Sequence, residues 1–119
     1  MRRSQKNSLN RRVLIIGKRR RAVMVLPPSA PVNLFVEPTE TYLYSAWEDT
    51  AGNEDGFRLY RRAFDDPFQV VAEMPANQTE FYDGNVDMGV IYTYYVVAFN
   101  AGGESAPSNE AAGELTIAA

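Results

Sequence analysis

The chain of 119 residues contains no cysteine and no histidine. Without cysteine it can form no disulfide, no thiolate nucleophile and no cysteine-based zinc or iron–sulfur site. Without histidine it lacks the commonest general base, the usual imidazole metal ligand and the usual pH switch. No nucleophile–base arrangement is visible among the remaining residue types. We therefore expect that the protein is not an enzyme and that it uses no cofactor, no metal and no small-molecule substrate.

Long apolar runs are also missing from the sequence. The longest are residues 13–16 and 22–26, far short of the roughly 18 residues that a membrane-spanning helix needs. A secretory signal peptide is a poor match, because the basic cluster at residues 18–21 interrupts the apolar region that such a peptide requires. We expect no membrane span, and the lack of cysteine leaves the compartment open.

The two signs of charge are separated along the chain. No acidic residue precedes Glu37, whereas nine of the twelve basic residues lie within the first 21 positions. These nine are Arg2, Arg3, Lys6, Arg11, Arg12, Lys18, Arg19, Arg20 and Arg21. Opposite charge in two parts of a chain is typical of an interacting tail joined to a soluble body. We predict that residues 1–27 form a basic arm that binds an anionic surface, such as nucleic acid, acidic protein or acidic lipid.

A proline-rich segment at residues 27–31 separates this arm from the rest of the chain, since proline fixes φ and stiffens the backbone. The body, residues 28–119, contains short apolar runs divided by turn residues, the pattern of a β-sandwich. No long stretch has the 3.6-residue period of an amphipathic helix. The predicted strands are residues 32–37, 41–47, 57–62, 68–72, 79–82 and 90–100, with a last strand within 108–117.

Side chains alternate between the two faces of a strand, so the spacing of apolar residues predicts which of them form the core. We assign to the core Leu43, Ser45, Trp47, Phe57, Leu59, Tyr92, Tyr94, Val96 and Ala98. Burial of a single large side chain of this kind contributes a few kcal/mol by area arguments.

The order and spacing of these residues resemble a fibronectin type III domain over about residues 28–117. The resemblance is carried by Pro28-x-x-Pro31-x-x-Leu34, Trp47, Gly56 to Arg61, Phe81-Tyr82-Asp83, and Tyr92-x-Tyr94-x-Val96-x-Ala98-x-Asn100 followed by Gly103 and Ser105. It implies an all-β, seven-strand Greek-key sandwich of immunoglobulin-like type. It also implies that Tyr92 is a tyrosine-corner residue whose hydroxyl bonds nearby backbone. Ser45 stands where an aliphatic residue is usual, so we expect a slightly underfilled core near Trp47.

Two loops contain clustered oxygen ligands that we interpret as ordinary loop residues. Asp83, Asn85 and Asp87 alternate as in calcium loops, but the glycine and glutamate that an EF-hand then requires are absent. The loop at 48–55 contains four carboxylates, and we expect it to be solvated. Asn77 begins a glycosylation sequon, which matters only in a eukaryotic secretory path.

A second group of aromatic and basic residues alternates away from the predicted core. An outer sheet face of a monomer is expected to be mostly polar, and Tyr, Phe and Arg are enriched in interfaces. The predicted contact residues of this outer sheet face are Arg58, Tyr60, Arg62, Tyr95, Val97 and Phe99. The alternative is that other parts of the same chain cover this stripe.

These features favour a non-catalytic structural or interaction module that is anchored by its arm in a larger assembly of protein partners, which could include further copies of itself. A phage virion suits this description best, with the chain as a decoration, head or tail protein. One alternative is an accessory spacer of a secreted or cell-surface bacterial protein that binds carbohydrate or protein. The other is nucleic-acid binding through the arm.

Overall fold

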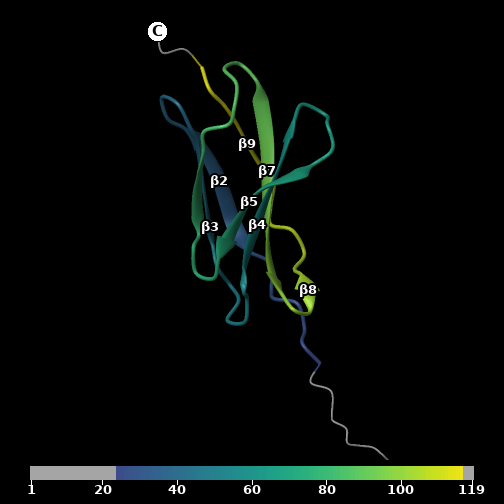
Figure 1. The fold of residues 1–119 in the computed structure, drawn as a ribbon. Helices are drawn as coiled ribbons and strands as arrows, with labels where there is room; N and C mark the ends of the chain where they lie inside the picture. Colours follow the sequence, from purple (N-terminus) through teal and green to yellow (C-terminus); the bar gives the residue numbers. More distant parts are fainter. Residues whose placement is uncertain (1–23, 117–119) are drawn as a thin grey trace, which may run out of the picture.

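The computed structural model describes residues 24–116 (Figure 1). The secondary-structure elements within that range are all β-strands, so the predicted all-β class is confirmed. The strands are β2 (Val32–Pro38), β3 (Leu43–Glu48), β4 (Gly56–Ala63), β5 (Gln69–Pro75), β6 (Glu80–Asp83), β7 (Ile91–Asn100), β8 (Gly103–Glu104) and β9 (Ala111–Glu114). Each predicted strand is present, with its ends shifted by a few residues at most.

The strands form two antiparallel sheets that pack face to face (Figure 1). One sheet has the order β2-β3-β6. The other has the order β5-β4-β7-β8, and β9 also pairs with β7. This arrangement is the immunoglobulin-like sandwich that the sequence predicts.

The predicted last strand contains β9, and a further short strand, β8, lies at the turn that the sequence indicates after Asn100; the two pair with different parts of β7. Between them the amides of Ser105 and Ser108 still donate to the carbonyls of Ala98 and Val96, but the acceptors for the β7 amides are serine hydroxyls instead of backbone carbonyls. The Ser105 hydroxyl oxygen accepts a hydrogen bond from the Ala98 amide, and the Ser108 hydroxyl oxygen accepts one from the Val96 amide, both at 3.0 Å. Serine side chains therefore satisfy the β7 amides between the segments that pair with β8 and β9.

The core lies between the sheets and contains every residue that the alternation assigns to it. The rings of Trp47 and Phe57 pack edge to face, with their centroids 5.6 Å apart. Ser45 is also buried, and its hydroxyl donates to the Phe81 carbonyl at 3.1 Å. The polar group in the aliphatic position is thus satisfied by the neighbouring strand.

The predicted tyrosine corner is confirmed. Tyr92 is buried, and its hydroxyl oxygen accepts a hydrogen bond from the Asp87 amide at 2.9 Å. This bond fastens the loop that precedes β7 to the strand itself.

The described chain enters the sandwich at the end that carries the turn between β7 and β8 (Figure 1). The Asn100 side-chain amide donates to the Leu26 carbonyl at 2.9 Å and to the Asn53 carbonyl at 3.1 Å. A Cβ at Gly102 would collide with the Val25 carbonyl oxygen, so glycine permits the close approach of this segment. These contacts hold Val25 and Leu26 against this end of the sandwich.

We expect Ser108→Ala to lower the free energy of unfolding by about 1–2 kcal/mol, because it leaves the buried Val96 amide without its acceptor. Chemical denaturation measures this change. Ser29→Ala is the matched control, since the Ser29 hydroxyl bonds Thr50 at the exposed surface and its loss is expected to cost under about 0.5 kcal/mol. Equal losses in the two variants would contradict the role of Ser108.

Candidate functional site

The predicted outer sheet face is assembled on β4 and β7 as the sequence indicates. Tyr60 and Tyr95 stack with ring centroids 4.7 Å apart and an interplanar angle of 11°. Phe68 packs edge-on against Tyr95 at the same separation, and the Arg62 guanidinium lies 4.6 Å from the Phe68 ring centre. The aromatic and basic side chains of this face therefore contact one another directly.

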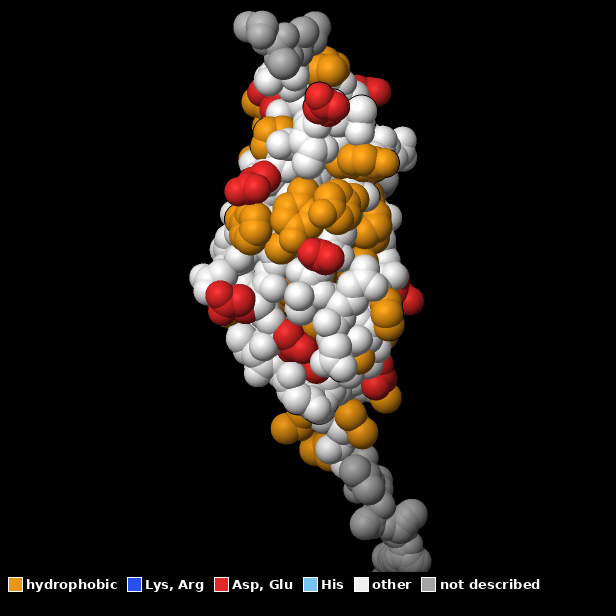
Figure 2. Space-filling view, turned by 90° about the vertical axis from the view of Figure 1, so that its left-hand side faces the viewer, with side chains coloured by type: hydrophobic (Ala, Val, Ile, Leu, Met, Phe, Trp, Pro, Cys, Tyr) orange, Lys and Arg blue, Asp and Glu red, His pale blue; other side chains and the backbone are white. Residues whose placement is uncertain are grey.

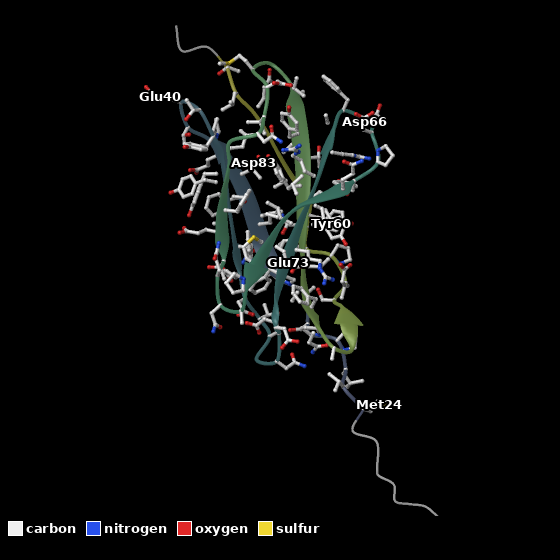
Figure 3. The ribbon with its side chains drawn as sticks, in the orientation of Figure 1. Met24, Glu40, Tyr60, Asp66, Glu73 and Asp83 are labelled. Carbon is white, nitrogen blue, oxygen red and sulfur yellow. The ribbon has the colours of Figure 1, made fainter. Side chains whose placement is uncertain are left out.

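The polar groups of this face are largely paired within the chain. Arg58 bonds Glu73 at 2.8 Å and Glu104 at 3.0 Å, and its guanidinium lies 4.0 Å from the centre of the Phe99 ring. The Tyr60 hydroxyl donates to Glu104 at 2.7 Å, and this hydrogen bond raises the pKa of Tyr60 to about 12. Glu73 and Tyr60 are labelled in Figure 3. The charged groups and the Tyr60 hydroxyl of this face thus have partners within the chain.

Val97 belongs to this face but is buried. Its side chain is 2% exposed, so it supports its neighbours and is not available to a partner. The other predicted residues of the face are partly buried. The predicted arm residues, from Arg2 to Arg21, lie outside the described residues.

A buried ionic cluster joins the two sheets, and the sequence did not predict it. Asp83, at the end of β6, accepts hydrogen bonds from the Tyr94 hydroxyl at 2.7 Å and from the Arg61 guanidinium at 2.8 Å (Figure 3). It also accepts one from the Asn85 amide at 3.1 Å. The carboxylate is occupied by these donors, which agrees with the interpretation of this loop as structural. Arg61 has the same inward phase on β4 as Phe57 and Leu59. An inward-facing charge of this kind requires a buried partner.

A small cavity opens beside the hairpin that joins β4 and β5. Its volume is about 290 Å³, and its lining includes Arg61, Arg62, Asp66 and Gln69. Within residues 24–116 no group of acidic side chains is arranged to hold a metal ion. The cavity offers hydrogen bonds and charge, and no nucleophile–base pair lines it.

The outer surface of the other sheet carries four aromatic side chains that we name the aromatic face: Phe35, Tyr42, Tyr44 and Tyr82. Phe35, Tyr42 and Tyr82 are 44%, 45% and 54% exposed. The rings of Tyr44 and Tyr82 lie 4.7 Å apart, and Phe35 and Tyr42 extend the group at 6.0 and 5.9 Å. The register places Tyr44 beside Tyr82 and diagonally from Phe35, so three separate strands form one surface.

Acidic residues surround the aromatic face. Glu37 on β2 is paired with Tyr44 on β3. Glu80 lies two residues before Tyr82 on β6, on the same face of the sheet. The Tyr44 hydroxyl donates to Glu80 at 2.7 Å, which raises the pKa of Tyr44 to about 12. The sequences of β2, β3 and β6 contain no Lys or Arg. Figure 2 shows hydrophobic side chains gathered across this side of the body, with acidic side chains around them and no basic one in view among the described residues.

The sequence prediction missed this surface, although each strand contains the pattern that gives rise to it. Phe35, Tyr44 and Tyr82 each alternate with buried neighbours, and such aromatic residues on an outward position are a usable indication of a contact surface. Their convergence depends on the register of β2, β3 and β6, which the sequence does not show.

No protein-family model matches the chain, and no curated protein matches it either. Solved structures do match the sandwich. A multidomain fragment of titin has a TM-score of 0.67 and 16% identity over 76% of this chain, which spans 32% of that fragment. An Fn3-like protein from Clostridium thermocellum has a TM-score of 0.60 and 22% identity, covering 77% of this chain and 96% of that one. A β-1,2-glucanase from Parabacteroides distasonis has a TM-score of 0.69 and 22% identity over 80% of this chain and 14% of its own.

The two sheets and these similarities define an immunoglobulin-like β-sandwich. Within that class the chain has a fibronectin type III-like fold, as the sequence pattern predicts. At these identities the likeness concerns the fold, and the function has to be argued from the side chains. No helix among residues 24–116 is long and apolar enough to cross a membrane.

We expect Asp83→Asn to destabilise the protein by about 3 kcal/mol or more, because it leaves the Arg61 guanidinium in the interior without its counter-charge. Urea denaturation at neutral pH measures the loss. Glu73→Gln is the control, since its ion pair with Arg58 is on the surface and its removal is expected to cost at most about 1 kcal/mol. A loss of stability in Asp83→Asn no larger than in the control would show that the buried pair is unimportant.

Stability is expected to fall at alkaline pH through Tyr94. Burial, together with the hydrogen bond to Asp83, raises the pKa of Tyr94 well above its ordinary value of 10.0. Above about pH 10 the unfolded chain therefore loses this proton while the folded chain keeps it, which favours unfolding by about 1.4 kcal/mol per pH unit. Tyr94→Phe should reduce the slope of unfolding free energy between about pH 10 and pH 11 by about 1 kcal/mol per pH unit, because the unfolded tyrosine is only partly ionised in this range. An unchanged slope would contradict this assignment.

Proposed function

We propose that this chain is a non-catalytic interaction module of a larger assembly, which binds a protein partner through the aromatic face. The observation that carries the proposal is the exposure of Phe35, Tyr42 and Tyr82 on one rigid sheet. Exposed aromatic groups of this kind, surrounded by charged residues, mark protein interaction sites. The rings already pack against one another, so little conformational freedom is lost when a partner covers them.

The proposal gives the outer faces of the two sheets different roles. The face on β4 and β7 pairs its arginines with its own carboxylates and aromatic rings, which suits a stabilised surface. The aromatic face leaves large rings exposed to solvent. The basic N-terminal arm is the anchor in the assembly, because its charge is opposite to that of the body.

The kind of assembly that we favour is a particle such as a phage virion, in which a small domain decorates the surface and its arm docks below. A division into an acidic body and a basic extension supports this reading. The alternative of a secreted accessory domain predicts binding to carbohydrate; the glucanase from Parabacteroides distasonis contains a similarly folded region. The experiment below distinguishes the two.

We expect the double variant Tyr42→Ser/Tyr82→Ser to lose incorporation into its native assembly by at least about tenfold, because two exposed aromatic contacts are removed. The measurement is the fraction of tagged full-length chain that co-sediments with particles or complexes from the source cells. Val70→Ser/Ile91→Ser is the matched control, since these side chains are 49% and 48% exposed on the opposite sheet.

Normal incorporation of the tyrosine variant, with its fold verified by circular dichroism, would overturn the proposal. So would recovery of the wild-type chain only as a free monomer. Binding of the isolated protein to an insoluble polysaccharide, lost in the same variant, would replace the assembly by the accessory-domain alternative.

A further inference from the structure

All basic side chains of the described body are on one strand. Residues 24–116 contain Arg58, Arg61 and Arg62 and no other Lys or Arg, and all three belong to β4. Arg58 and Arg61 pair with carboxylates, and Arg62 lies against Phe68. The carboxylates on the β2-β3-β6 sheet have no basic residue on their own strands, so the aromatic face lies in a field of negative charge.

The aromatic face has the components of a site for guanidinium or ammonium groups. A cation within about 6 Å of an aromatic ring centre is attracted by the ring, and more strongly where it also meets a carboxylate. The chain uses this arrangement on the opposite sheet, where Arg58 lies 4.0 Å from the centre of the Phe99 ring and also bonds Glu73 and Glu104. On the aromatic face the rings, Glu37 and Glu80 are present, and β2, β3 and β6 contain no arginine.

The chain itself contains a segment of matching chemistry. Residues 1–21 include nine basic residues and no acidic one, and the apolar run Val13 to Ile16 lies among them. Such a segment can place cations on the rings and carboxylates and apolar side chains on Phe35. It precedes Met24, and the bond from Asn100 holds Leu26 at one end of the sandwich. An extended chain covers about 3.3 Å per residue, so roughly twenty residues can span the whole sheet of a neighbouring copy.

We propose that the aromatic face binds the arginine-rich N-terminal segment, residues 2–21, of a second copy of this protein. The inference rests on the proposed function, because it names the partner chemistry of that same surface. Cation–π contacts and pairing with Glu37 and Glu80 supply the recognition, and the strength of binding decreases as salt screens the charges.

The test uses the full chain with its arm neutralised, in which all nine basic residues of positions 1–21 are replaced by Gln. We expect the side-chain NMR signals of Phe35, Tyr42 and Tyr82 to differ from wild type, while those of Tyr60 and Tyr95 do not. A synthetic peptide of residues 1–23, added to the neutralised chain, should restore the wild-type positions. Its affinity should fall at least about tenfold between about 50 mM and about 0.5 M salt.

Further variants make the result specific. Tyr42→Ser/Tyr82→Ser should weaken peptide binding at least about tenfold, Phe35→Ala should weaken it independently, and Val70→Ser/Ile91→Ser should leave it unchanged. Sedimentation against concentration shows whether the bound arm comes from a second copy, as the proposal requires. A contact that does not depend on concentration would place the arm on its own chain and overturn the proposal. Unchanged signals on the aromatic face would overturn it, as would shifts confined to the acidic loop at residues 48–55.

The outcome is distinguishable from a failure of the proposed function. If the tyrosine variant loses incorporation into the assembly while the peptide leaves the aromatic face unchanged, the interaction module stands and its partner is another protein. If the peptide binds and incorporation is normal, the arm contact stands and the assembly uses a different surface.

Discussion

The hydrogen bonds of the buried Asp83 carboxylate are the polar interaction on which the rest of the sandwich depends. Two sheets that meet through apolar side chains alone have little to fix their relative position, because hydrophobic contact is non-directional. Asp83 on β6 bonds Arg61 on β4 and Tyr94 on β7, so its directional bonds connect the sheets. Each of the three groups would be costly to bury without the others. The cluster therefore favours one alignment of the sheets over its alternatives.

This cluster also shapes the surface charge. It retains one of the three arginines of the described body in the interior, and the other two lie on the outside of the same strand. Arg58 uses two surface carboxylates on its own sheet. The strands of the β2-β3-β6 sheet contain no basic residue, so their charged side chains are all acidic. The negative field over the aromatic face follows from the confinement of the cations to β4.

Much of the fold could be predicted from the sequence, because period-two alternation, turn residues and a few large apolar side chains are all local. Trp47 and Tyr92 occupy the positions that the pattern assigns to them. The aromatic face could not be predicted in the same way, since Phe35, Tyr44 and Tyr82 converge only through strand register. Ser105 and Ser108 were missed for a related reason: their hydroxyls replace ladder bonds to residues on a strand that the sequence does not place beside them. Val97 has the outward phase that alternation predicts, and only the packing of its neighbours reveals that it is buried.

A fibronectin type III-like fold does not determine a ligand, so specificity has to come from what the sheets display. Tyrosine is well suited to this task on a sheet, because its ring buries a large area and has few rotatable bonds to immobilise. On the aromatic face the rings restrict one another further, as Tyr44 packs on Tyr82 and bonds Glu80. A preorganised aromatic surface in a negative field selects against acidic and strongly hydrated partners and in favour of weakly hydrated cations. Guanidinium is such a cation, and the same chain provides it in the N-terminal segment.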